Sequence, residues 1–233
     1  METIINRMQN TYSKSGLVLD ISGQKLRETG RDIIRDKSRH MNHGMCINET
    51  NIIQTKEGIC ALSFDGVNDY VEVPHFDEFP REDVTVEFWL YQRAYGDAAS
   101  YINKRTNGND GLMFFMFIDH KLFFDWGNGN SNHRWDCGYI PPLKEWVHIT
   151  ITRDVNGRYL YVNGNLFSFT TNPGGPIPEA NTSKIMLMRD SMGSQHYVNG
   201  LIDEVRIYNR ALSAEEVRGN MFTSKRYRYM RGV

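Results

Sequence analysis

The sequence lacks the apolar segments that export and membrane insertion require. Its beginning, METIINRMQNTYSKSG, contains no apolar run and no small-residue cleavage site, so we expect no secretory signal peptide. No uninterrupted apolar run reaches the length of a membrane-spanning helix, because even the richest stretch, 112–126, contains Asp119, Lys121 and Asp125. We therefore expect a soluble protein that is synthesised in the cytoplasm.

Cysteine is scarce, and charge is balanced. The three cysteines, Cys46, Cys60 and Cys137, are an odd number in a chain long enough to bury a core without cross-links. This argues against a disulfide framework, although a single bridge between Cys46 and Cys60 stays open as an alternative. With 27 Lys and Arg against 28 Asp and Glu, no global field draws nucleic acid or an anionic membrane.

Glycine and proline are not enriched, and helical patterns are nearly absent. The 20 glycines and 7 prolines among 233 residues exclude a collagen-like or low-complexity chain. Almost every patterned segment alternates apolar and polar residues, most clearly 84–91, 147–152 and 201–208. This period of two is typical of strands that bury one face. Asn-Gly and Asp-Gly pairs separate the strands, and the run 154–157 predicts a hairpin turn.

One segment near the end of the chain predicts a helix. Ser213 followed by Glu216 forms a capping-box pattern, and Gly219 is a natural stop. Many short strands over more than 200 residues then predict an all-β fold. We expect a two-sheet antiparallel β-sandwich of the jelly-roll type with one short C-terminal helix.

Six segments occur in an order that is informative as a set. They are DKSRHMNHG (36–44), ALSFDGVNDYVEVP (61–74), VTVEFWLY (84–91), EWVHITITR (145–153), YLYVNG (159–164) and GLIDEVRIYNRALS (200–213). Together they resemble laminin-G-like domains of the concanavalin A-like lectin/glucanase superfamily. In the first segment, Arg39 and Met41 stand where the family pattern has glycines.

The resemblance implies how the chain is divided and what it does. It assigns residues 16–217 to one domain, with an N-terminal extension, 1–15, and a basic, tyrosine-containing tail, 218–233. It implies a curved jelly roll of about 12 to 15 strands and a binding role more often than an enzymatic one. Because one fold hosts many functions, the function must be argued from the site.

The carboxylate pattern of a glycoside hydrolase is missing. The glucanase relatives carry closely spaced acids on one strand, in a pattern such as E-x-D-x-x-E. Here Glu87 stands alone on its strand, and neither Asp119 nor Asp125 has a glutamate partner at the right spacing. We therefore expect no enzyme.

A structural calcium ion is the cofactor that the sequence favours. Asp203 has the parity of Val205 and Ile207, so its carboxylate is expected to point to the apolar side, where it needs a cation or several donors. In relatives, such an aspartate and a backbone carbonyl group after an early strand bind the same calcium ion. The resemblance carries the aspartate's role to Asp203 and the carbonyl's role to Asp65 or Gly66. Alternatively, Asp203 accepts turn N–H groups or pairs with an arginine.

Zinc is a weaker alternative. His40, His43 and Cys46, with Cys60 further on, have spacing that could hold the ion. The paired spacing of a zinc knuckle is absent, and His43 falls on a structural turn of the family pattern.

An aromatic hairpin is the candidate ligand site. Sugar sites combine a flat aromatic ring with a few polar groups that bind hydroxyls. Between residues 114 and 135 these candidates are Trp126, Asn130, Arg134 and Trp135. Alternatively, both tryptophans are core residues, as aromatic stripes usually are.

The tail is a candidate docking segment for a partner. It has no acidic residue after 217, and its basic and aromatic residues at the end are Arg226, Tyr227, Arg228, Tyr229 and Arg231. Only this tail could attract nucleic acid, and we expect it to pack on the body of the protein or on neighbouring subunits.

Two functional hypotheses follow. The first is a non-catalytic lectin-like module that recognises a glycan or a protein surface. The alternative is a structural subunit of a virion or similar assembly, as a decoration, capsid-associated or fibre protein. Such a subunit would end on the surface of the assembly.

Overall fold

The computed structural model describes residues 12–26, 32–54, 60–106, 110–128, 134–177, 181–191 and 196–231. The strands are β1 (Leu17–Leu26), β2 (Ile33–Asp36), β3 (Gly44–Ile47), β4 (Asn51–Gln54), β5 (Cys60–Asp65), β6 (Tyr70–Val73), β7 (Val84–Gln92), β8 (Ala99–Lys104), β9 (Asp110–Met116), β10 (Leu122–Asn128), β11 (Arg134–Asp136), β12 (Trp146–Asp154), β13 (Gly157–Val162), β14 (Asn165–Thr170), β15 (Ile185–Leu187) and β16 (Asn199–Tyr208). The helices are α2 (Ala214–Thr223) and α3 (Lys225–Arg231).

The strands form two antiparallel layers that share β1. The first sheet has the order β14-β13-β12-β7-β16-β1, with β5 paired to β16 and β4 to β5. The second sheet has the order β11-β10-β9-β8-β15-β6-β3-β2. β1 pairs with β16 up to Ile21 and with β2 around Lys25, after a register shift between these residues. This arrangement confirms the expected jelly-roll sandwich, and the described residues contain 16 strands, slightly more than the resemblance implied.

The core lies between the sheets, where the alternation of the sequence places it. Val86, Phe88 and Leu90 of β7 point inward, as Phe114 does from β9 of the opposite sheet. The rings of Phe88 and Phe114 meet edge to face with centroids 5.4 Å apart. The strands therefore bury one apolar row each, as their period of two predicts.

Hairpin turns also form where the sequence predicts them. Asp154 is paired with Gly157 at the end of the β12–β13 ladder. Asp154 accepts hydrogen bonds from the backbone N–H groups of Asn156 and Gly157, at 2.8 and 3.2 Å, through its Oδ1 atom. This side-chain contact closes the turn locally.

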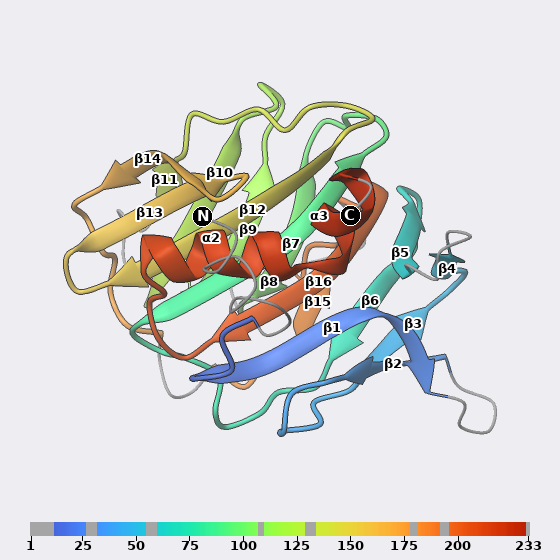
Figure 1. The fold of residues 1–233 in the computed structure, drawn as a ribbon, viewed down its shortest axis with the longest axis horizontal. Coiled ribbons are helices and arrows are strands. Elements are labelled where there is room, and N and C mark those ends of the chain that lie inside the picture. Colours follow the sequence, from blue (N-terminus) through green and yellow to red (C-terminus); the bar gives the residue numbers. More distant parts are fainter. Residues whose placement is uncertain are drawn as a thin grey trace.

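Two helices cover the outer face of the first sheet (Figure 1). α2 begins with the predicted capping box, because Ser213 and Glu216 each accept the other's backbone N–H through their side chains. Gly219 does not end the helix, which continues to Thr223. Val217 belongs to an apolar cluster with Tyr161, and such packing offsets the roughly 1 kcal/mol that an internal glycine costs.

The C-terminal segment is part of the fold in this structure. The boundary expected after residue 217 falls inside α2, and α3 continues as a second short helix. Within the described part of the chain, no helix is long and apolar enough to cross a membrane.

Candidate functional site

The outer face of β8–β11 carries a cluster of aromatic rings. Since Phe114 and Phe124 point into the core, their neighbours Phe115 and Phe123 point outward, and the two are paired across β9 and β10. Phe117, just beyond β9, completes the cluster. Ring centroids lie 4.9 Å apart for Phe115 and Phe117, 5.5 Å for Phe115 and Phe123, and 5.1 Å for Phe117 and Phe123. We call these three residues the phenylalanine cluster.

Arg134 of β11 lies over the phenylalanine cluster. Its guanidinium carbon is 5.1 Å from the ring centroid of Phe115 and 4.9 Å from that of Phe117. The Asp125 carboxylate, which is 5% exposed, holds the guanidinium at 3.2 Å, while the Arg134 side chain is 46% exposed. The arrangement fixes the cation in place and leaves donors toward solvent, which suits recognition of hydroxyl or carbonyl oxygens.

A small hollow of about 90 Å³ adjoins Arg134 on this face. Asp190 lies in its wall and pairs with Arg105 at 2.8 Å. The Nδ1 atom of His196, which is 39% exposed, lies 3.3 Å from the same carboxylate. The hollow therefore combines apolar side chains with a few fixed polar groups, which is the composition of small-ligand sites.

Two of the predicted ligand residues are wrong. Trp126 is fully buried and Trp135 is 9% exposed, and both belong to the core. The reason is parity: Trp126 shares the inner side of β10 with Phe124, so its ring cannot serve as a platform for a sugar. Arg134 does reach the surface beside the hollow, and Asn130 lies outside the described residues.

The sequence analysis did not identify the outward-facing phenylalanines of β9 and β10 as candidates. Alternation along 112–126 already places Phe115 and Phe123 on the side opposite Phe114 and Phe124. That signal identifies most of the phenylalanine cluster. His196 and Asp190 have no local pattern, because other loops bring them to the hollow.

Asp203 does not point to the apolar side as its parity suggested. The β16–β7 register shifts between Asp203 and Arg206, and Glu204 adopts a positive φ of 49°. This is a β-bulge, in which one extra residue reverses the alternation of the strand. Val205 and Ile207 still face the core, whereas Asp203 faces the helices.

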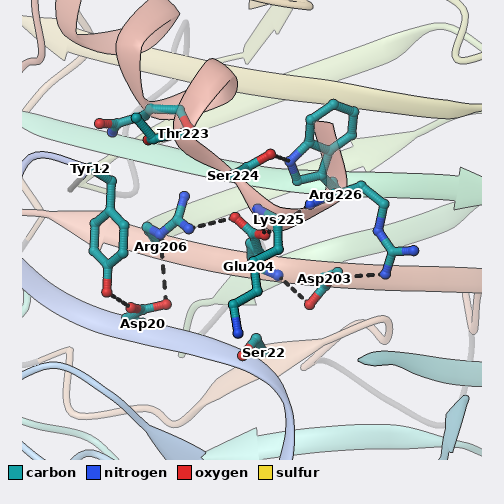
Figure 2. Close-up of polar contacts among 12 residues, drawn as sticks. Tyr12, Asp20, Ser22, Asp203, Glu204, Arg206, Thr223, Ser224, Lys225 and Arg226 are labelled. Atoms are coloured by element: carbon teal, nitrogen blue, oxygen red, sulfur yellow. Dashed lines mark hydrogen bonds and ion pairs between the residues drawn. The ribbon is translucent and has the colours of Figure 1, made fainter. Parts of the chain in front are cut away.

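The Asp203 carboxylate is met by an arginine (Figure 2). Arg226 of α3 donates from Nη2 to Oδ2 at 2.8 Å, and its guanidinium lies 4.1 Å from the ring centroid of Trp146. Burial and the neighbouring charge of Glu204 raise the pKa of Asp203 to about 6, while Arg226 opposes the shift. The alternative pairing with an arginine is therefore the one observed.

The predicted calcium ligands are not brought together. Asp65 is paired with Asn199, four residues before Asp203 on β16, which is about 13 Å at the usual strand rise. Gly66 has a positive φ of 82° and lies against Asn199, so its role is to close the turn. The structure therefore does not bring Asp65, Gly66 and Asp203 together, and binding of calcium stays a prediction.

The histidines considered for zinc also have other partners. His43 Nδ1 accepts the backbone N–H of Asp36 at 3.2 Å, and His40 Nδ1 lies 3.4 Å from a Glu78 oxygen. Across the ranges that the structure describes, no three His, Cys, Asp or Glu side chains are grouped to hold a metal ion.

Part of the basic tail packs against the protein's own first sheet and α2. Arg226 is 2% exposed and donates to Asp203, so at this residue the tail packs on the body of the protein, the first of the two expected alternatives, and does not dock on a partner. Tyr227 packs edge to face on Phe222 of α2, with centroids 5.0 Å apart. The remaining predicted docking residues lie in α3, with side chains outside the described set: Arg228, Tyr229 and Arg231.

Comparisons with known proteins agree with this architecture. The family model Laminin_G_3, described as concanavalin A-like lectin/glucanases superfamily, matches residues 65–218. Human adhesion G-protein coupled receptor D1 is 33% identical over 92 residues, which cover 38% of this chain and 10% of the receptor.

Two solved structures share the fold. The binding domain of Paraclostridial Mosquitocidal Protein 1 has a TM-score of 0.67 and 20% identity, over 89% of this chain and 52% of that one. Domain 4 of AbnA, a GH43 extracellular arabinanase from Geobacillus stearothermophilus, was solved in complex with arabinotriose; it has a TM-score of 0.67 and 17% identity, over 90% of this chain and 100% of that one. The chain thus spans about half of the mosquitocidal chain and a tenth of the receptor.

Proposed function

The chain belongs to the concanavalin A-like lectin/glucanases superfamily, and from that premise we propose that it is a non-catalytic module that binds a glycan on the outer face of β8–β11. The observation that carries the proposal is the Arg134 guanidinium, held by Asp125 over the phenylalanine cluster at the edge of a hollow. The half-buried rings of Phe117 and Phe123 suit the C–H faces of a sugar, whereas Phe115 is buried under Arg134. The fixed polar groups suit the hydroxyls of the sugar.

The relatives support a binding role. One neighbour in fold is a domain of an arabinanase in complex with arabinotriose, and another is the binding domain of a toxin. Because these chains are 20% identical or less, they supply the class of function and no ligand contacts.

The electrostatics of this face favour binding over hydrolysis. A glycosidase needs a protonated carboxylic acid and a second carboxylate across the scissile bond. Asp125 and Asp190 are instead paired with Arg134 and Arg105, at 3.2 and 2.8 Å. Both carboxylates are thus committed to ion pairs that position the two arginines.

The test is a glycan array followed by calorimetry on the oligosaccharides that are retained, with arabinotriose included. We expect Arg134→Ala and Phe117→Ala each to weaken binding about tenfold or more, because each removes part of the proposed contact surface. Phe169→Ala is the matched control, since that exposed ring lies on β14 of the first sheet. No retained glycan, or equal losses in all three variants, would contradict the proposal, and release of shorter sugars would contradict its non-catalytic part.

A structural subunit is the second candidate, and one observation favours it. β14 is the last strand of the first sheet, and Leu166, Phe167 and Phe169 are 53%, 50% and 61% exposed. An exposed apolar edge is suited to pairing with another chain.

A further inference from the structure

A second hollow lies far along the fold from the phenylalanine cluster. It measures about 580 Å³ and is formed by the start of β1, the segment after β2 and the residue following β16. Its lining includes Lys14, Lys37 and Arg39, together with the hydroxyl groups of Ser15 and Ser38. Lining of this kind offers many hydrogen-bond donors and positive charge.

The charge of the hollow has one sign. The lining contains three permanent cations and His40, and it contains no Asp or Glu. This is a local concentration, because the whole chain has a formal net charge of −1. A concave surface lined by one sign of charge raises the local concentration of ions of the opposite sign.

Three carboxylates contact lining residues: Glu78 lies 3.4 Å from His40 Nδ1, Asp36 accepts from Ser38, and Asp20 accepts from Tyr12. Asp36 is buried, and its two oxygens accept hydrogen bonds from the backbone N–H groups of Ser38 and Asn42, at 2.8 and 2.7 Å. Asp20 accepts the hydroxyl of Tyr12 (Figure 2) and lies 3.6 Å from Arg206. These contacts satisfy Asp36 and Asp20 beneath the hollow.

The cations have donors to spare. Lys37 uses one of its three Nζ protons on Ser22 Oγ. Arg39 donates from Nε to His40 Nε2 at 3.3 Å, and this bond does not use its two terminal nitrogens. The fork of a guanidinium matches two oxygens of a sulfate or phosphate group.

The segment that carries Arg39 is held rigidly. The Asp36 carboxylate accepts hydrogen bonds from the backbone N–H groups of Ser38 and Asn42. Met41, between these two residues, adopts a positive φ of 56°. A backbone fixed in this way presents Arg39 with little ordering cost on binding.

We propose that this hollow binds a tetrahedral oxyanion, a sulfate or phosphate group, through Lys14, Lys37 and Arg39. The volume far exceeds that of one such ion, so the group is carried on a larger ligand, as in a sulfated glycan. This proposal does not depend on the phenylalanine cluster.

The test measures binding of four probes at constant ionic strength: inorganic sulfate, inorganic phosphate, a heparin oligosaccharide and a hyaluronan oligosaccharide. Wild type should bind heparin most tightly, inorganic sulfate or phosphate weakly, and hyaluronan, whose charges are carboxylates, least. The double variant Lys14→Gln/Arg39→Gln should weaken heparin binding about tenfold or more.

The matched control is Lys144→Gln/Arg218→Gln, which removes the same charge from exposed positions outside the hollow. It should change heparin affinity less than about twofold. Equal losses in both double variants would indicate general surface charge and overturn the proposal. Wild type that binds none of the oxyanions, or binds hyaluronan as tightly as heparin, would also overturn it. Loss on Arg134→Ala alone would assign heparin to the phenylalanine cluster and overturn the proposal for this hollow.

Discussion

His148 of β12 is buried without a hydrogen-bond partner on either ring nitrogen among the described residues. Its ring packs against Trp89 with centroids 5.0 Å apart. Burial, together with the charge of Arg206, lowers the pKa of His148 to about 3. The folded protein therefore keeps this imidazole neutral at pH values where an unfolded chain would protonate it.

This burial predicts acid sensitivity. Because the folded pKa lies below the unfolded value near 6.5, the free energy of unfolding falls as pH falls from 6.5 toward 3. At pH 4.5, two units below the unfolded value, His148 alone lowers stability by roughly 2 to 3 kcal/mol. Urea unfolding of wild type and His148→Phe at pH 7.5 and 4.5 measures this difference, because phenylalanine keeps the ring and does not titrate. Parallel losses of stability in the two proteins would contradict the prediction.

The sequence predicts the inner or outer position of most strand side chains, but not of every residue. Alternation correctly places Phe88 and Leu90 inside, and the same rule applied to β10 would have placed Trp126 inside. Asp203 could not be placed by that rule, since one residue added in a bulge reverses the parity of a strand. A bulge depends on contacts with neighbouring strands, and these are not local in sequence.

At the scale of elements, α2 and α3 are fixed to the first sheet by buried polar contacts. Asn220 donates to Glu87 at 3.0 Å, and the indole N–H of Trp89 donates to Ser224 Oγ at 3.1 Å. The backbone N–H of Lys225 donates to Glu204 at 2.9 Å (Figure 2). The start of α2 was predictable from its local capping box, whereas this docking depends on residues more than a hundred positions away.

Removing one partner of the buried ion pair tests this docking. Arg226→Met leaves the Asp203 carboxylate buried without its cation, and we expect a loss of about 3–5 kcal/mol in stability. Asp203→Asn combined with Arg226→Met should recover part of that loss, because the double variant buries no unpaired charge. Urea unfolding of the two single variants and the double variant measures the coupling. If the loss of unfolding free energy in the double variant equals the sum of the losses in the two single variants, the ion pair does not hold α3 in place.

At the scale of the whole molecule, the sandwich was predictable because six motifs and the strand period agree, and the family match confirms it. The proposed binding face was not predictable, because it depends on which outer face of the sandwich stays uncovered. The first sheet is covered by α2 and α3, and the phenylalanine cluster lies on the second.

The edge of the first sheet predicts self-association. β14 carries no charged residue, and charge is a usual protection of an edge strand. We expect sedimentation velocity to show dimers that increase with concentration, formed by antiparallel pairing of two β14 strands. Phe169→Lys should keep the protein monomeric, while Val67→Lys, at an equally exposed turn, should not. Identical sedimentation of both variants and wild type would contradict this pairing.

β16 occupies the middle of the first sheet although it is the last strand of the chain. It pairs with β1, β5 and β7, and the Asn199 to Tyr208 segment leaves the ribosome after all three. During synthesis, the edges of β1, β5 and β7 that pair with β16 stay unpaired until β16 has been made, so folding depends on contacts that are distant in sequence. A nascent chain stalled before β16 therefore exposes unpaired strand edges, to which chaperones can bind.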